Sequence, residues 1–235
     1  MKQILASMLA VMLVMGCKSA QVDHAAPVNT LSRSEQKHGF QLLFDGRNLD
    51  QWRSFKKPDV KGWAIEGDNL ICTGGGGDLL TREEFRSFEL LCEWKIPPKG
   101  NSGIIYRCDE SGGATWHTGI EYQLWDHSQS PDKWHALNAT AACYDLYRPS
   151  QQADRPPGQW NTTRILLDGN HLEHWLNGKK VVDCEIGSDD WNARVAKSKF
   201  ATHKNWGQLE RGHIALQEHG GETAFRNIKI RVIEK

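Results

Sequence analysis

Short segments in which apolar and polar residues alternate recur through most of this chain. The segment 88–96 shows the alternation most clearly, and it stops at Pro97 and Pro98. Because successive side chains of a β-strand point to opposite faces of its sheet, such a segment predicts a strand with one buried face. Further strands are expected at 102–108, 120–125, 163–167, 213–217 and 224–232.

Turn signals separate these segments. Asp168-Gly169 and Asn177-Gly178 are typical of tight hairpin turns, so they join three short strands into an antiparallel meander. Helical periodicity is weak, and short helices are expected only at 81–86 and 191–198. The pattern predicts an all-β fold, a two-sheet antiparallel β-sandwich or jelly roll, in which the outer face of one curved sheet can form a groove.

The first residues of the chain have a different character. Lys2 precedes an apolar run from Ile4 to Met15, which is too short to cross a bilayer comfortably. Residues 1–17 are therefore interpreted as a secretory signal peptide. The run ends in Gly16-Cys17, which resembles a bacterial lipoprotein cleavage box. We expect lipidation at Cys17 and a lipid anchor in the cell envelope; the bulky Met15 leaves ordinary cleavage nearby as an alternative.

The remaining chain divides into a tether and one domain. Residues 18–37 are polar and show no apolar periodicity, which predicts a flexible tether. Residues 38–235 form a single domain, of a length that is normal for an all-β sandwich. Five cysteines follow Cys17, so at least one thiol is expected to be unpaired within the chain.

The composition separates two classes of partner. Lysine plus arginine and aspartate plus glutamate both number 29, so the charge provides no reason to expect nucleic-acid binding. Tryptophan is abundant, with ten residues. Indole rings stack on the apolar faces of sugar rings, and the composition therefore favours a carbohydrate as the partner.

Strand alternation sorts the polar residues by face. Along 120–125 the apolar positions should point to the core, which leaves Glu121 and Gln123 on the opposite face. Along 102–108 the apolar set ends at Cys108, so Arg107 is expected on the same outer face as Glu121. A solvated, salt-bridged sheet face is the simpler alternative. The nearby loops favour a sugar site, because they are rich in hydrogen-bonding groups and rings: Asn101, His117, Asp126 and Asp145.

A set of ordered segments resembles the 3-keto-disaccharide hydrolase domain family. The set includes Leu-Phe-Asp-Gly-Arg-Asn-Leu at 43–49, Gly-Ile-Glu-Tyr-Gln-Leu at 119–124 and His-Trp-Leu-Asn-Gly at 174–178. Further matching segments are 75–80, 100–104, 160–161, 211–217 and 225–228. The resemblance extends over residues 38–233. It implies a concanavalin A-like jelly roll and a secreted enzyme that acts on glycosides already oxidised to a ketone at C3.

The chemistry of such a substrate suggests roles for individual residues. A C3 ketone acidifies the proton on C2, and its removal gives an enediolate that can expel the group at C1. This route needs a base near C2, a positive or hydrogen-bonding group at the C3 oxygen and a proton donor for the leaving oxygen. Arg107 is predicted to stabilise the enolate, while Glu121 and His117 are the base and the acid in an undecided order.

Substrate-binding roles are assigned to a larger set. Gln123 and Asn101 are expected to hold hydroxyl groups. For His174 and Trp175 a core position is as good an interpretation as a functional one. The other predicted substrate-binding residues are Asp126, Asp145, Gln217 and His219.

Two rival functions remain open. Glu121, Gln123 and Asp126 have the spacing of the Glu-x-Asp-x-x-Glu strand of retaining glucanases with this fold, but the central acid is Gln and the last acid is shorter. Retaining hydrolysis needs two closely placed carboxyl groups, so these substitutions argue against it. A non-catalytic carbohydrate-binding module or lectin would explain the tryptophans and Gln123 equally well.

No cofactor is predicted to be required. Glu121, His117, Asp126 and His127 are of ligand type, and a divalent metal at such a group would stabilise an enediolate. Their spacing matches no specific metal motif. The glycine run 74–77 followed by Asp78 lacks the repeated acids of a calcium loop, and it is interpreted as a flexible turn.

Overall fold

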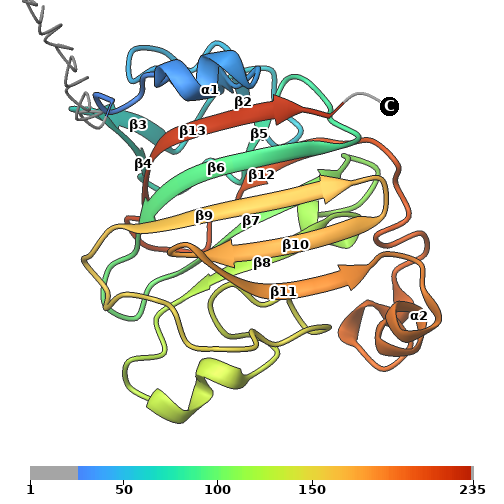
Figure 1. The fold of residues 1–235 in the computed structure, drawn as a ribbon. Helices are drawn as coiled ribbons and strands as arrows, with labels where there is room; N and C mark the ends of the chain where they lie inside the picture. The colour runs from blue at the N-terminus through green and yellow to red at the C-terminus, as the bar shows by residue number, and fades with distance from the viewer. Residues whose placement is uncertain (1–25, 234–235) are drawn as a thin grey trace, which may run out of the picture.

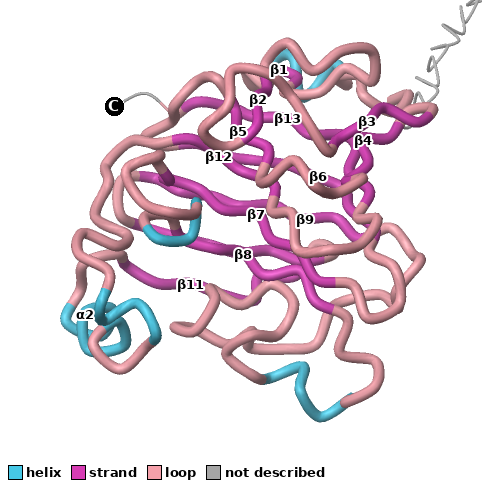
Figure 2. Tube along the Cα trace, turned by 180° about the vertical axis from the view of Figure 1, so that it is seen from behind, coloured by secondary structure: helices cyan, strands magenta, loops and turns pink. Residues whose placement is uncertain are grey.

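The computed structural model describes residues 26–233, and they form two stacked antiparallel sheets. The larger sheet faces the viewer in Figure 1 and the smaller sheet faces the viewer in Figure 2. The predicted all-β sandwich is confirmed. None of the helices in the described range is both long and apolar enough to span a membrane.

The larger sheet contains, in spatial order, β11 (Lys179–Glu185), β10 (His171–Leu176), β9 (Asn161–Asp168), β6 (Phe88–Lys95), β13 (Ala224–Val232), β4 (Asn69–Cys72) and β3 (Trp63–Glu66), with β1 (Gln41–Leu42) paired to β13. The smaller sheet contains β2 (Trp52–Ser54), β5 (Leu79–Thr81), β12 (His213–Leu216), β7 (Asn101–Cys108) and β8 (Ile120–Trp125). The helices are α1 (Arg33–Lys37) and α2 (Asp189–Val195), with 3₁₀ turns η1 (Thr115–His117), η2 (Pro131–His135) and η3 (Lys199–Thr202).

The core lies between the two sheets. Alternate residues of the strands point inward, and the largest of them, including Trp52, Trp94 and Phe225, are at most 1% exposed. Phe88 of β6 meets Tyr106 of β7 edge to face, with ring centroids 6.1 Å apart. Inner faces of stacked sheets interdigitate in this way, and the buried apolar area is the main stabilising contribution.

The predicted meander is present, but one predicted helix is not. β9, β10 and β11 pair in sequence, and their turns place Gly169, Asn177 and Gly178 at positive φ. The helix expected at 191–198 is α2, which begins after the cap residue Ser188. The helix expected at 81–86 is wrong. Phe85 instead forms a β-bridge with Gly212 and packs in the core.

The structure also corrects the predicted tether. Ser32 and Glu35 cap α1 reciprocally, and Glu35 forms an ion pair with Lys229 of β13 at 2.8 Å. The backbone amide of Asn29 donates to the side chain of Asn227. Residues 26–37 therefore belong to the folded unit. Helix capping, a hydrogen bond and an ion pair to β13 hold this segment in place, although it shows no apolar periodicity. The predicted signal peptide and Cys17 lie outside the described residues.

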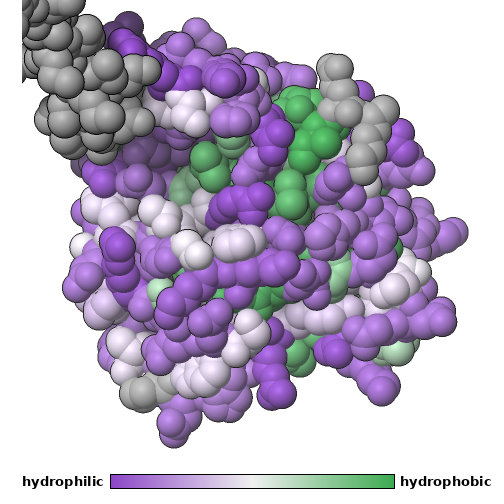
Figure 3. Space-filling view, in the orientation of Figure 1, coloured by the Kyte–Doolittle hydropathy of each residue, from purple (hydrophilic) through white to green (hydrophobic). Residues whose placement is uncertain are grey.

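The outer faces of the two sheets differ. The outer face of the larger sheet is mostly hydrophilic (Figure 3) and carries ion pairs that join β6, β9, β10 and β13. The outer face of the smaller sheet carries a second, small apolar cluster of Leu80, Ile105, Cys108 and Ala215. Trp116 of η1 packs over this cluster, so a loop overlies part of the outer face of the smaller sheet.

Candidate active site

A pocket of about 180 Å³ lies on the outer face of the smaller sheet. Five residues that were predicted for the site line it together: Asn101, Glu121, Gln123, Gln217 and His219. Three residues that sequence reasoning did not assign complete the lining: Trp116, Tyr144 and Lys199. The pocket thus combines a carboxyl group, the ammonium group of a lysine, side-chain amides and aromatic rings.

Glu121 lies flat over the backbone of β7. It pairs with Ile105 across the strands, and its side chain reaches diagonally over Gly103. A Cβ atom at position 103 would lie 2.7 Å from Glu121 Oε1, so glycine is required there for the carboxyl group to fit. The Gln123 amide, with its nitrogen turned inward, donates to Glu121 Oε1 at 2.9 Å and to the Ser102 carbonyl at 3.0 Å.

The environment of Glu121 raises its pKa to about 7. Burial is the main cause, since the residue is 4% exposed. The positive charge of Lys199 opposes this rise in pKa, and the negative charge of Asp78 adds to it. A carboxyl group with such a pKa can exchange a proton near neutral pH, as general acid–base catalysis requires.

Lys199 brings a positive charge to the mouth of the pocket. Its ammonium lies 4.1 Å from the ring centre of Tyr144 and 4.6 Å from that of Trp116. The Lys199 backbone amide donates to Asp145 Oδ2 at 2.7 Å, which fixes the start of η3. Partial burial among the rings lowers the pKa of Lys199, although the residue as a whole is exposed. A lone lysine on a short turn carries no sequence signal that distinguishes it from a solvated one.

A buried framework holds the loops around the pocket. Asp78 accepts a hydrogen bond from the Glu218 backbone amide at 2.9 Å and another from the Thr115 hydroxyl. Burial raises the pKa of Asp78. Through these bonds Asp78 ties the segment that carries Gln217 and His219 to the turn that carries Trp116.

The glycine run 74–77 binds a carboxylate in this framework. The backbone amides of Gly75, Gly76 and Gly77 all donate to the carboxylate of Glu218. Consecutive amides that converge on an anion form a nest, and side chains are absent where the backbone must curl around it. The segment 74–77 is therefore a receptor for Glu218, which corrects its interpretation as a plain flexible turn.

Arg107 does not lie in the pocket, so its predicted role is wrong. Arg107 has φ 49°, and the pairing of β7 with β12 shifts its register at this residue. The guanidinium turns to the end of the sandwich, where it donates to the carbonyls of Arg86 at 2.8 Å and Gly169. The bulge interrupts the alternation, so Cys108 joins the outer apolar cluster in place of the predicted core.

His117 is outside the pocket as well. Its ring contacts Trp116 with centroids 4.2 Å apart and His203 at 4.6 Å, and its Nδ1 accepts a hydrogen bond from the Gly113 amide. Burial lowers the pKa of His117, and the neighbouring His203 and Lys199 lower it further. His117 therefore supports Trp116 at the rim and does not line the pocket.

The two acids assigned to substrate binding act within loops. Asp126 uses both carboxylate oxygens on backbone amides, that of Lys99 in the β6–β7 connection at 2.6 Å and that of Ser128 on its own loop at 2.8 Å. Asp145 has its φ at 62° and holds the Lys199 amide. Neither lines the pocket.

His174 and Trp175 lie elsewhere too. His174 is fully buried between the sheets, where it bonds the Tyr106 hydroxyl at 2.8 Å and the Ala141 carbonyl at 3.0 Å. Burial lowers the pKa of His174 to about 4, so it is a neutral core histidine. Trp175 lies on the far face of the larger sheet, with its indole N–H bonded to Glu173 at 2.7 Å.

The ligand-type residues suggested for a metal do not converge. Within residues 26–233, three His, Cys, Asp or Glu side chains approach to within 4.8 Å of one another only at His171, Glu173 and Asp183, on the edge of the other sheet. Lys180 already bonds Glu173 at 3.0 Å and also bonds Asp183 there. A lysine ammonium thus supplies the positive charge between these carboxylates.

The chain is similar to several known proteins in sequence and in structure. Residues 39–231 match the model of the 3-keto-alpha-glucoside-1,2-lyase-like domain. A 3-keto-disaccharide hydrolase of Bacteroides thetaiotaomicron is 29% identical, over 89% of this chain and 84% of that protein. The crystal structure of a candidate glycosyl hydrolase from Parabacteroides distasonis superimposes with a TM-score of 0.81 at 32% identity, over 88% of this chain and 100% of that one.

A second candidate glycosyl hydrolase from P. distasonis has a TM-score of 0.65 at 27% identity, over 83% of this chain and 99% of that one. The family match covers both sheets and every residue that lines the pocket. The chain therefore belongs to the 3-keto-alpha-glucoside-1,2-lyase-like domain family.

Proposed function

We propose that the protein is a glycoside-cleaving enzyme that acts on 3-keto-glycosides through abstraction of the C2 proton. The family match and the named relatives support a glycoside as the substrate. The observation that carries the proposal is the buried Glu121 carboxyl group, whose pKa is about 7, in a pocket rich in amides and rings.

Glu121 is the proposed base. A carboxylate with a raised pKa binds a proton more strongly than an ordinary one, so it is better matched to a carbon acid. Glu121 takes the proton from C2, and the C2–H electron pair forms the C2–C3 double bond of the enediolate. The enediolate then re-forms the C3 ketone and expels the oxygen at C1, which leaves a C1–C2 double bond to which water can add.

Lys199 replaces Arg107 as the proposed cation for the developing negative charge on the C3 oxygen. It is the ammonium group among the pocket-lining residues, and it is the positive charge that acts on Glu121. A positive group aimed at a developing oxyanion lowers the barrier more than it strengthens ground-state binding.

His219 is the proposed proton donor for the leaving oxygen. It lies in the pocket lining, and its Nδ1 is 3.3 Å from the Asn101 amide nitrogen. Asn101, Gln123 and Gln217 are proposed to hold sugar hydroxyls, and Trp116 and Tyr144 to stack on ring faces. This chemistry needs no cofactor, so dialysis against EDTA is expected to leave the rate unchanged.

Retaining hydrolysis of ordinary glycosides has less support. It needs a second carboxylate free to act. Gln123 occupies the central position of the strand, and both oxygens of Asp126 are already bonded to amides. Asp78, the other nearby acid, is held by Thr115 and Glu218.

The decisive experiment compares a glucoside with its 3-keto derivative in deuterated buffer. Release from the 3-keto compound alone, with deuterium incorporated at C2, is the expected result. Cleavage of both at similar rates would favour double displacement. Binding without cleavage of either would favour a carbohydrate-binding module.

We also propose export and lipid anchoring at Cys17, supported by Lys2, the apolar run and the Gly16-Cys17 order. Cell fractionation is expected to recover the wild-type protein with membranes and the C17A variant in the soluble fraction. Unchanged membrane association of C17A would contradict the anchor.

A further inference from the structure

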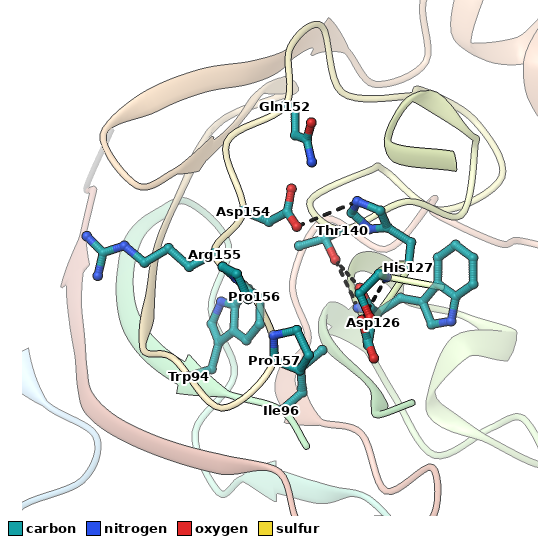
Figure 4. Close-up of a pocket in the computed structure, with 12 residues that line it drawn as sticks. Trp94, Ile96, Asp126, His127, Thr140, Gln152, Asp154, Arg155, Pro156 and Pro157 are labelled. Atoms are coloured by element: carbon teal, nitrogen blue, oxygen red, sulfur yellow. Dashed lines mark hydrogen bonds and ion pairs between the residues drawn. The ribbon is translucent and has the colours of Figure 1, made fainter. Parts of the chain in front are cut away.

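A second pocket of about 180 Å³ lies at the end of β8, under the segment 152–157 (Figure 4). Its apolar walls come from both sheets and the covering loop: Trp94, Ile96, Trp125, Pro156 and Pro157. The polar groups that face it include His127 and Asp154, which point toward one another in Figure 4. None of these residues takes part in the proposed chemistry.

His127 is 5% exposed, and its side chain makes no hydrogen bond of normal length in the described part of the chain. Its Nδ1 has no partner there, and its Nε2 lies 3.6 Å from Asp154 Oδ2. A buried polar group without a partner destabilises a fold, and such groups are rare unless they serve a function or bind a ligand. His127 therefore marks this pocket as more than a packing defect.

Asp154 adds a second polar group with free bonding capacity. Its side chain is 19% exposed, and its polar contact within residues 26–233 is the long one to His127. The side chain of Arg155 turns away from the pocket (Figure 4). Its guanidinium donates to the Trp160 carbonyl at 2.9 Å. Among the described residues, therefore, neither a lysine nor an arginine pairs with this carboxylate, which disfavours anionic ligands.

A carboxylate and an imidazole beside indole and proline walls match one class of ligand. The carboxylate accepts from vicinal hydroxyl groups, the imidazole donates or accepts, and the apolar walls contact the C–H face of a ring. These are the requirements of a neutral sugar.

The two pockets share no lining residue, but neighbouring positions of β7 and β8 line them. Gln123 lines the first pocket and Trp125, two residues further on the same face, lines the second. Asn101, also in the first pocket, pairs with Trp125 across the strands. Two residues of a strand span about 7 Å, so one ligand can reach from one pocket to the other.

We propose that Trp125, His127 and Asp154 form a second carbohydrate subsite, which binds the sugar ring that lies beyond the reacting ring of the substrate. The assignment of this pocket to the ring beyond the reacting one rests on the proposed function. The binding of a sugar in this pocket does not.

Kinetics of D154N test this subsite. Asp154 is partly exposed, so the variant is expected to fold, and D132N changes an exposed carboxylate on η2 as the matched control. We expect D154N to raise KM about tenfold or more for a 3-keto disaccharide, the loss typical of a charged hydrogen bond. Its kcat, and both constants for methyl 3-keto-glucoside, should stay at wild-type values. No change, or an equal change with both substrates, would overturn the proposal.

A binding measurement separates this proposal from the function of the first pocket. Wild type, D154N and D132N are titrated with the unoxidised disaccharide and followed by tryptophan fluorescence and ligand-observed NMR. Binding by wild type and D132N that D154N weakens supports the subsite, even if no substrate is cleaved. Equal binding by all three proteins, or no binding by wild type, would overturn it.

Discussion

The outer faces of the two sheets each hold a buried glutamate, and the two have opposite properties. Glu89 on the larger sheet is 8% exposed and Glu121 on the smaller sheet is 4% exposed. Burial alone would raise the pKa of Glu89, but hydrogen bonds from Arg164 and Arg231 outweigh it and lower the pKa. Glu121 accepts instead from the neutral Gln123 amide, burial dominates, and its pKa rises to about 7.

The comparison shows that the partners of a carboxylate, rather than its depth, decide what it can do. Arg164 and Arg231 lower the pKa of Glu89 and so favour its ionised form, in a ladder of ion pairs that joins neighbouring strands. Glu121 has an amide neighbour in Gln123 and a single lysine at the pocket mouth. It can therefore change its protonation state near neutral pH, and this capacity distinguishes a reactive group from a structural one.

The strongest test of this difference is the pair E121Q and E89Q. E121Q is expected to lower kcat by about a hundredfold or more, because it removes the proposed base. E89Q should retain kcat within about twofold, since a structural ion pair does not touch the substrate. Steady-state kinetics on a 3-keto-glycoside measure both. Full activity of E121Q would end the assignment of Glu121 as base.

The next test concerns Lys199. K199M is expected to lower kcat by about tenfold to a hundredfold through the loss of an electrostatic contribution to the transition state. It should also move the rising limb of the kcat/KM–pH profile upward from about 7, because Lys199 lowers the pKa of Glu121. K197M, at an exposed lysine of the same segment, is the control and should match wild type. A profile unmoved in K199M would contradict the coupling.

A smaller effect is expected in the pH dependence of stability, and it should have opposite signs for Glu121 and Glu89. The folded-state pKa of Glu121 is raised from 4.5 to about 7, so stability is lost as the pH rises through this window. The free energy of unfolding of E121Q, relative to that of wild type, should therefore increase by about 2–3 kcal/mol from about pH 4 to about pH 8. The lowered pKa of Glu89 means that E89Q should lose about 1–3 kcal/mol at neutral pH and less in acid.

Urea unfolding monitored by tryptophan fluorescence at the two pH values measures these free energies. The same sign of pH dependence in E121Q and E89Q would refute the contrast between the two faces.

The smallest catalytic effect is expected at Arg107, which lies outside both sheet faces. R107M should keep kcat within about twofold and lose about 1–3 kcal/mol of stability, because two partly buried carbonyls lose their donor. Thermal unfolding and kinetics on the same preparation test this. A large loss of kcat without a loss of stability would restore Arg107 to the catalytic group.

Several features followed from the sequence because they depend on neighbours along the chain. Alternation in 120–125 placed Glu121 and Gln123 on one outer face, and the structure has them there. The turn residues at 168–169 and 177–178 located the meander. Both inferences rest on the two-residue period of a strand and on local turn geometry, which distant contacts rarely alter.

Other features were decided by the tertiary structure, because they arise where distant segments meet. A bulge set by pairing with β12 turned Arg107 out of register, and the Tyr106 hydroxyl of the opposite sheet made His174 a core residue. Lys199 entered the site from a turn that only folding brings to β8. The sequence determined which residues face outward, whereas the packing of loops over the sheet determined which charges share a pocket, and electrostatic effects on a pKa depend on that proximity.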